Sequence, residues 1–242
     1  MITVSGLRKS FGSLTVLDGI DFHVPAGTVY ALLGPNGAGK TTMVEILTTL
    51  IAPDAGEVTI DGHDLRRSPG RIRQIFGVTG QFSAVDSILS GRENLRLITD
   101  LRHLGARAGR AKADELLERF DLTEAADRSV MTWSGGMKRR LDLAMTLIGD
   151  PKLIFLDEPT TGLDPRGRRA IWEIVRDLVA NDGVTVFLTT QYLDEADRLA
   201  DTVALLDHGR LVASGSAEEL KSSVGADSTL DDVFFTLTGG IR

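Results

Sequence analysis

Residues 34–42 have the spacing of a phosphate-binding loop, with four residues between two glycines and then a lysine and a threonine. The glycines let the backbone turn its N–H groups inward around an anion, and a following helix directs its positive dipole end to the same point. Lys40 is expected to reach the β- and γ-phosphates of a nucleotide, and the Thr41 hydroxyl to bind Mg²⁺. This spacing favours a nucleotide site over a plain glycine-rich turn. The predicted contacts are Gly34, Pro35, Asn36, Gly37, Ala38, Gly39, Lys40, Thr41 and Thr42.

A second candidate pair stands where an apolar run ends in two acids, Asp157 and Glu158. A nucleotide site needs a carboxylate at a strand end to hold the Mg²⁺ shell, and Asp157 suits that role. Glu158 is placed to polarise a water toward the γ-phosphate. Two exposed acids at a strand end are the alternative, and the phosphate loop in the same chain disfavours it.

Ser134, Gly135 and Gly136 form a third candidate, shortly before that apolar run. The serine can cap a helix and the glycines expose backbone N–H groups, so this is a second helix N-terminus suited to phosphate. Taken alone, the pattern favours an ordinary helix start. It gains weight only beside the other two motifs.

Strand and helix signals place these motifs at the ends of buried strands. The phosphate loop lies between an apolar β-type run at residues 28–33 and a helical period at 42–50. Continuous apolar runs at 153–156 and 184–188 are typical of parallel strands covered on both faces, with a helix expected between them at 165–180. Further short strands are expected at residues 2–4, 20–24, 57–60, 75–79, 203–206 and 210–213. The pattern predicts an α/β fold in which antiparallel hairpins accompany the nucleotide loop.

Helical periods replace strand runs between residues 82 and 150, with helices expected at 92–104 and 110–120. We interpret residues 82–150 as a helical subdomain inserted into a single domain that spans 1–242.

The tail, residues 216–242, is also expected to be helical. Thr229 is suited to cap a helix whose first turn holds Asp231 and Asp232, as the helix dipole favours. The apolar face of that helix either packs on its own domain, which we favour, or forms an interface. That face carries Leu230, Val233, Phe234 and Leu237.

Composition narrows the class of protein. The 242 residues have a net charge of −7, which disfavours nucleic acid as a partner, and the basic clusters at 138–140 and 166–169 are better interpreted as solvated helix faces. There is no cysteine, which excludes disulfides and thiolate metal ligands. We find no signal-peptide pattern and no apolar run long enough to span a bilayer, so we expect a cytosolic chain.

Phe11 lies in a short stretch, residues 10–12, that is interpreted as a polar loop in which an aromatic ring has little core to join. From the local sequence, stacking on a purine base and packing at a domain edge are equally favoured.

Taken in order, the motifs resemble those of the nucleotide-binding subunits of ABC transporters, and the resemblance covers nearly the whole chain. Phe11 falls where that family places its adenine-stacking aromatic, which favours the stacking interpretation. The matching segments are residues 34–42 as Walker A, Gln81 as the Q-loop, Ser134, Gly135 and Gly136 as the signature, 153–158 as Walker B, and Asp164 in the D-loop.

The resemblance implies ATP and Mg²⁺ as cofactors, with Thr41, Gln81 and Asp157 around the metal. It implies a head-to-tail homodimer in which each ATP lies between the Walker A of one chain and the signature of the other. It also implies that the helical subdomain docks on a separate transmembrane permease subunit, with Gln81 linking that subdomain to the Mg²⁺ site.

Two positions depart from the family pattern. The signature ends in Met137 where glutamine is frequent, and Gln191 stands where the switch histidine usually sits. Glutamine can donate a hydrogen bond to the γ-phosphate but carries no proton or charge, so acid–base chemistry must fall to Glu158. The Gln191 variant and the residues 230–234 together resemble the daunorubicin/doxorubicin-resistance type of drug exporter.

We therefore expect a P-loop NTPase core of the ABC ATPase type, with an antiparallel β-subdomain and an inserted α-helical subdomain. Its predicted catalytic set is Glu158, Lys40, Gln81 and Gln191. The expected function is ATP hydrolysis that powers export of a drug-like or lipophilic substrate at the cytoplasmic side of the cell membrane. Alternatives are a soluble ABC-type ATPase acting on DNA or ribosomes, a nucleotide-sensing regulator, and an importer ATPase.

Overall fold

A six-stranded sheet forms the centre of the fold and presents apolar side chains on both faces. The structure is a computed structural model that describes residues 1–80, 84–225 and 227–239. The strands lie in the order β10-β9-β3-β8-β7-β6, and every neighbouring pair is parallel except β10 with β9. These strands are β3 (Val29–Leu33), β6 (Phe76–Thr79), β7 (Leu153–Asp157), β8 (Thr185–Thr190), β9 (Thr202–Asp207) and β10 (Arg210–Gly215).

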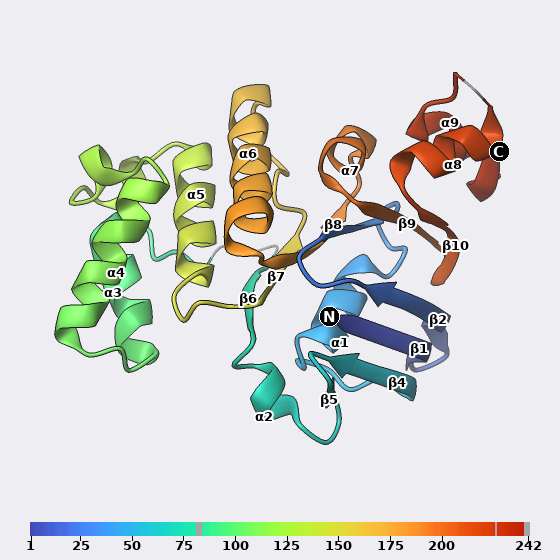
Figure 1. The fold of residues 1–242 in the computed structure, drawn as a ribbon, viewed down its shortest axis with the longest axis horizontal. Helices are drawn as coiled ribbons and strands as arrows, with labels where there is room; N and C mark the ends of the chain where they lie inside the picture. Colours follow the sequence, from blue (N-terminus) through green and yellow to red (C-terminus); the bar gives the residue numbers. More distant parts are fainter. Residues whose placement is uncertain (81–83, 226, 240–242) are drawn as a thin grey trace.

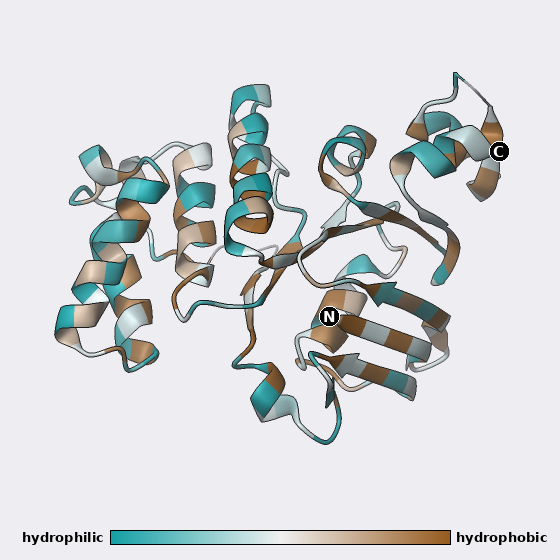
Figure 2. Cartoon of the chain, viewed as in Figure 1, coloured by the Kyte–Doolittle hydropathy of each residue, from teal (hydrophilic) through white to brown (hydrophobic). Residues whose placement is uncertain are grey.

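Alternate residues of the central strands belong to two different cores. In β3, Ala31 and Leu33 face a core shared with helices, whereas Tyr30 and Leu32 face a core shared with a second sheet. Every residue of β3, β7 and β8 is buried, and β7 is largely brown in Figure 2. This confirms that the apolar runs at 153–156 and 184–188 are parallel strands covered on both faces.

The second sheet is antiparallel and covers helix α1 (Lys40–Leu47), as Figure 1 shows. Its order is β2-β1-β4-β5, and its strands are β1 (Ile2–Phe11), β2 (Leu14–Val24), β4 (Ala55–Ile60) and β5 (His63–Asp64). The sequence predicted short strands here, but β1 and β2 are long. Register shifts let the ladder continue through polar residues, and one such shift lies at Gly6, whose φ is +57°.

Phe11 is consequently not in a loop, as the sequence suggested, but at the end of β1, where it pairs with Leu14. The sequence did not indicate this, because the bulged strand extends through polar residues that carry no clear alternation.

Helices cover the other face of the central sheet and both of its ends (Figure 1). Helices α3, α4 and α5 lie together at one end, α6 and α7 lie over the sheet, and α8 and α9 lie at the other end near the C-terminus. Their bounds are α2 (Pro69–Ile72), α3 (Gly91–Leu101), α4 (Ala106–Arg119), α5 (Gly135–Thr146), α6 (Pro165–Asp182), α7 (Leu193–Leu199), α8 (Ala217–Val224) and α9 (Leu230–Thr238), with 3-10 turns at Thr123–Ala125 and Val130–Thr132.

The predicted helices exist, with shifted ends. Helix α3 begins earlier than expected because Ser90 and Glu93 form a capping box. Helix α4 begins four residues before the predicted start at 110, and the prediction missed its first turn because that turn carries no apolar period. No helix in the described part of the chain is long and apolar enough to cross a bilayer.

The tail helix α9 begins after Thr229, whose side chain caps it as predicted. Leu230 and Val233 join the main core, which confirms that this face packs on its own domain. Leu237 is 40% exposed, so the packing covers the first part of the helix rather than its full length.

Candidate functional site

The phosphate loop connects β3 to α1 at the carboxyl edge of the central sheet. The Gly34 N–H donates to the Thr190 carbonyl at 3.3 Å, which ties the start of the loop to the end of β8. A Cβ at position 34 would lie 2.3 Å from the Leu206 carbonyl oxygen, so only glycine fits against the end of β9. The loop is therefore positioned by two neighbouring strands before any ligand binds.

Lys40 is buried at the first position of α1, and its ammonium group points back into the loop. Its Nζ lies 2.7 Å from the Gly34 carbonyl, 3.1 Å from the Pro35 carbonyl and 3.4 Å from Glu158 Oε1. The side chain is 5% exposed. A buried cation whose partners among the described residues are carbonyls and one carboxylate suits a site that receives an anion.

The two acids after β7 have different surroundings. Asp157 is buried and its Oδ1 accepts a hydrogen bond from the Thr189 hydroxyl on the adjacent strand. Glu158 has a φ of +49°, and its N–H donates to the Thr189 carbonyl at 3.1 Å. Its Oε2 accepts a hydrogen bond from the Thr161 hydroxyl at 3.2 Å. At Glu158 the backbone leaves β7 in a left-handed conformation, and the side chain reaches Lys40. A left-handed conformation at a residue other than glycine is costly and often occurs at functional sites.

A cavity of about 320 Å³ lies over this edge of the sheet. It is lined by Val16, Asn36, Gly37, Gly39, Lys40, Thr41, Thr42 and Glu158. Loop N–H groups, a lysine and a threonine hydroxyl are the donors that nucleotide phosphates require. Among the described residues, no group of three or more His, Cys, Asp or Glu could hold a metal. A magnesium ion bound largely by phosphate oxygens and water fits that donor set better than an all-protein cage would.

The remaining predicted residues lie at different distances from this cavity. Gln191 directly follows β8 and is half-buried beside the loop, since Thr190 pairs with Leu33. Phe11 does not line the cavity. Its ring is 51% exposed, with the Lys9 Nζ 5.3 Å from the ring centroid. Gln81 lies outside the described residues, so its predicted role stays a prediction.

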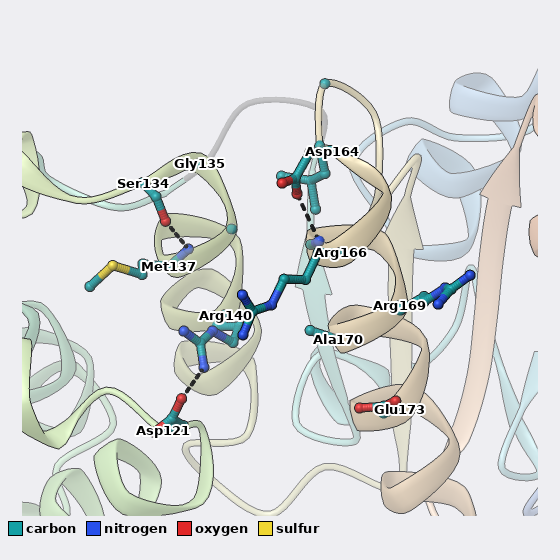
Figure 3. A pocket seen from close by; sticks show the side chains of 14 residues that line it. Asp121, Ser134, Gly135, Met137, Arg140, Asp164, Arg166, Arg169, Ala170 and Glu173 are labelled. Atoms are coloured by element: carbon teal, nitrogen blue, oxygen red, sulfur yellow. Dashed lines mark hydrogen bonds and ion pairs between the residues drawn. The ribbon is translucent and has the colours of Figure 1, made fainter.

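The third motif lies in a separate groove of about 760 Å³ between the N-termini of α5 and α6 (Figure 3), which we call the signature groove. Ser134 caps α5 by accepting from the Met137 N–H at 3.2 Å, and Asp164 caps α6 by accepting from the Gly167 N–H at 2.8 Å. The lining also includes Gly135 and Gly136 but no residue of the first cavity. One chain therefore keeps its two sets of candidate phosphate contacts apart.

Charged side chains of both signs line this groove, and two arginines approach each other across it. Figure 3 shows Arg166 on α6 extending toward Arg140 on α5. Arg140 is ion-paired with Asp121 at 3.0 Å, whereas Arg166 and Arg169 are exposed. An exposed groove with helix N-termini and arginines can accept an anionic group, provided that something else supplies its opposite wall.

Sequence reasoning missed Thr189, Val16 and Arg139. Thr189 is a buried hydroxyl at the end of an apolar strand, and a polar residue in such a run was the available signal. Val16 lines the cavity from β2, which no local pattern indicates. Arg139 belongs to the 138–140 cluster interpreted as a solvated face, yet its side chain is only 12% exposed, so that interpretation is wrong for this residue.

Comparisons with known proteins agree with this arrangement. Residues 17–161 match the ABC transporter family. A daunorubicin resistance ATP-binding protein of Streptomyces coeruleorubidus is 55% identical over 226 residues, which are 93% of this chain and 71% of the relative. A doxorubicin resistance ATP-binding protein of Mycobacterium tuberculosis is 51% identical over 93% of this chain and 68% of the relative.

Solved structures show the same fold. An ATP-binding subunit of an ABC transporter matches with a TM-score of 0.85 and 28% identity, over 98% of this chain and 99% of that one. A dimeric ATP-binding cassette in a post-hydrolysis state with ADP and Pi matches with a TM-score of 0.79 and 26% identity, over 89% of this chain and 98% of that one. With its phosphate loop, acid-ended strand and capped signature helix in one fold, this chain belongs to the ATP-binding subunits of the ABC transporter family.

Proposed function

We propose that this ATPase powers an efflux transporter, in which ATP hydrolysis drives export of a drug-like or lipophilic substrate through a separate membrane subunit. The observation that carries the hydrolytic part is the contact of Lys40 with Glu158 inside the phosphate-loop cavity. Export is supported by the relatives, because those named above are drug-resistance ATP-binding proteins.

In this proposal the loop residues bind ATP and prepare it for attack. N–H groups of residues 34–42 surround the phosphates, and Lys40 exchanges its carbonyl partners for the β- and γ-phosphate oxygens. Thr41, Asp157 and Gln81 would hold Mg²⁺, which would neutralise charge on the phosphate oxygens when bound. Thr189 keeps the Asp157 carboxylate oriented through its hydroxyl.

Glu158 then acts as the base that orients and deprotonates the attacking water. In the structure its carboxylate is held by Lys40 and by the Thr161 hydroxyl. When Lys40 turns to phosphate, one carboxylate oxygen is freed for water. Gln191, beside the loop, donates a hydrogen bond to the γ-phosphate, and Phe11 stacks on the adenine.

In this proposal, the signature groove of a second copy of the chain completes the nucleotide site. Ser134, Gly135, Gly136 and Asp164 of one protomer would face the ATP held by the phosphate loop of its partner. The separation of the two cavities in one chain supports this arrangement, because a single chain cannot close both around one nucleotide.

A membrane subunit would dock on the helical subdomain, residues 82–150, at the cytoplasmic face of the membrane. Large apolar side chains are exposed there, including Ile88 at 75%, Leu101 at 66% and Met131 at 65%. Ile88 and Met131 lie near one another, because the Met131 N–H donates to the Ser87 carbonyl at 2.7 Å. Exposed apolar residues that lie near one another are typical of a surface that a partner covers.

Steady-state phosphate release by the purified chain tests the hydrolytic part, with Lys40→Ala as the inactive control. We expect Mg²⁺-dependent release from the wild type and monomer-to-dimer conversion with ATP in size-exclusion chromatography. Release no faster than that of Lys40→Ala, with and without the membrane subunit, would refute the proposal. Drug accumulation in cells that express both subunits, compared with Lys40→Ala, tests export.

A further inference from the structure

Arg139 on α5 reaches from the signature helix into the protein, toward the edge of the central sheet. Its Nε donates to the Pro159 carbonyl at 2.7 Å, and its Nη2 donates to the Asp157 carbonyl at 3.3 Å. Its Nη1 donates to Asp142 Oδ2 at 3.1 Å and, more weakly, to the Gly80 carbonyl at 3.5 Å. One buried guanidinium therefore contacts the backbone after two strands.

The contacted carbonyls have a specific place in the site. Those of Asp157 and Pro159 belong to the residues on either side of Glu158. The carbonyl of Gly80 follows β6, which pairs directly with β7 through Thr79 and Leu156. The guanidinium thus fixes the backbone around the proposed base from outside the nucleotide cavity, whose lining does not include Arg139.

Asp142, one helical turn later, balances the charge. It is 3% exposed, and its Oδ1 accepts from the Ala84 N–H at 3.3 Å. Burial lowers the pKa of Arg139, and the Asp142 carboxylate opposes that shift, so the guanidinium stays charged. A buried pair of this kind is a poor source of stability compared with apolar residues of equal volume, whereas removing one partner alone is costly.

We propose that Arg139 and Asp142 form a positioning pair that sets the backbone on both sides of Glu158 from helix α5, coupling the signature end of that helix to the water-activating carboxylate. The inference rests on the proposed function of Glu158. Ser134 caps the same helix five residues before Arg139, so a displacement of α5 by phosphate at the signature moves the guanidinium and the carbonyls that it holds.

The geometry requires arginine rather than any cation. The planar guanidinium directs donors to three carbonyls in different directions, while a lysine offers one compact ammonium group. Arg139→Lys keeps the charge beside Asp142 but cannot span Asp157 and Pro159 together. Because a small misplacement of a reacting group lowers turnover strongly, we expect kcat to fall about tenfold or more with the KM for ATP within about twofold of the wild type.

The experiment compares Arg139→Lys with a matched control, Arg119→Lys. Arg119 on α4 is also ion-paired, with Asp177 and Asp182 of α6, and lines neither the nucleotide cavity nor the signature groove. We expect the control to keep kcat within about twofold. Amide hydrogen exchange of residues 157–161, measured without nucleotide, should accelerate in Arg139→Lys and not in Arg119→Lys.

A double variant, Arg139→Met with Asp142→Leu, removes both charges of the pair together. We expect it to fold and still show the reduced kcat, since the carbonyls of Asp157 and Pro159 have lost the donor that held them. Wild-type kcat in this double variant, or unchanged hydrogen exchange in Arg139→Lys, would overturn the proposal, as would a raised KM at unchanged kcat. A wild type without ATPase activity would instead refute the proposed function, and the hydrogen exchange result would still report on the pair.

Discussion

The nucleotide cavity and the signature groove are built in opposite ways. The cavity lies where buried parallel strands end. The pairing of β3, β8 and β7 holds the backbone that leads into it. The groove lies between two helix N-termini whose caps, Ser134 and Asp164, are exposed. The first is complete as a cradle for phosphate, whereas the second has only one wall.

The two regions also differ in how their charged side chains are arranged. Lys40 and Glu158 neutralise each other inside the cavity, so the cavity holds its own counter-ion until a nucleotide arrives. The groove has arginines at its centre, with Arg166 exposed. Under the proposed function, nucleotide binding depends on the cavity alone and turnover depends on both regions.

The largest expected effect is that of Glu158→Gln, which keeps the shape of the cavity and removes the base. We expect turnover to fall about a hundredfold or more, since loss of one group that acts mainly in the transition state costs about 3 kcal/mol. ATP affinity should remain and the ATP-bound dimer should accumulate. Phosphate release measures the turnover, and size-exclusion chromatography measures the dimer. Glu118→Gln, at an exposed surface residue, is the control. Unchanged turnover would remove Glu158 from the mechanism.

A carboxylate placed in the signature groove should affect turnover without affecting nucleotide binding, and so distinguishes the roles of the two regions. In Gly136→Asp the new side chain has room, because the nearest atom to an added Cβ is the Gly167 Cα at 3.9 Å. Repulsion of phosphate should lower turnover at least about tenfold while nucleotide affinity of the monomer is unchanged. Equilibrium binding of a fluorescent ATP analogue and phosphate release measure the two quantities.

A mixing experiment then tests whether the two regions meet across protomers. Gly136→Asp has an intact phosphate loop, and Lys40→Ala has an intact signature, so a mixed dimer contains one composite site without either change. Mixing two nearly inactive variants should restore measurable turnover. If the mixture remains as inactive as its components, the two regions do not form one site between chains.

Gln191 is expected to give a smaller effect. A single hydrogen bond to phosphate contributes about 1 kcal/mol, so Gln191→Ala should lower kcat about fivefold. Gln191→His should keep or exceed wild-type turnover, because histidine can donate the same bond. Parallel kcat measurements decide the point, and an alanine variant as active as the wild type would show that glutamine is not a phosphate sensor.

The sequence predicted what depends on local pattern. The phosphate loop, the acid-ended strand and the helix cap at Ser134 are short signals, each readable within a few residues, and the structure has all three at the predicted elements. The parallel strands were equally predictable because continuous apolar runs are typical of strands buried on two faces.

What the sequence did not show depends on contacts between distant residues. The hydrogen bond of Thr189 to Asp157 exists because β8 pairs with β7, and no local pattern contains that pairing. Arg139 resembled a surface arginine until the fold placed Pro159 within its reach. The length of β1 was also missed, since its bulges remove the alternation that marks a strand.

The smallest expected effect tests a part of the molecule that lies outside both regions, the capping box of α3. Ser90→Ala removes the side chain that accepts from the Glu93 N–H, and should lower the free energy of unfolding by about 1 kcal/mol and the Tm by about 2–4 °C. Because Ser90 lines neither cavity nor groove, kcat should not change.

The same box should respond to acid through Glu93. Its pKa is lowered because the carboxylate accepts from the Ser90 backbone N–H and then from the Ser90 hydroxyl. A lowered folded-state pKa stabilises the fold above the ordinary value of 4.5, and that contribution is lost as the pH falls through the folded-state pKa. The Tm difference between wild type and Glu93→Gln should therefore be present at about pH 7 and shrink toward about pH 3.5. A difference that stays constant over this range would mean that the carboxylate charge does not stabilise the cap, and a change in kcat would mean that α3 acts on one of the two phosphate-binding regions.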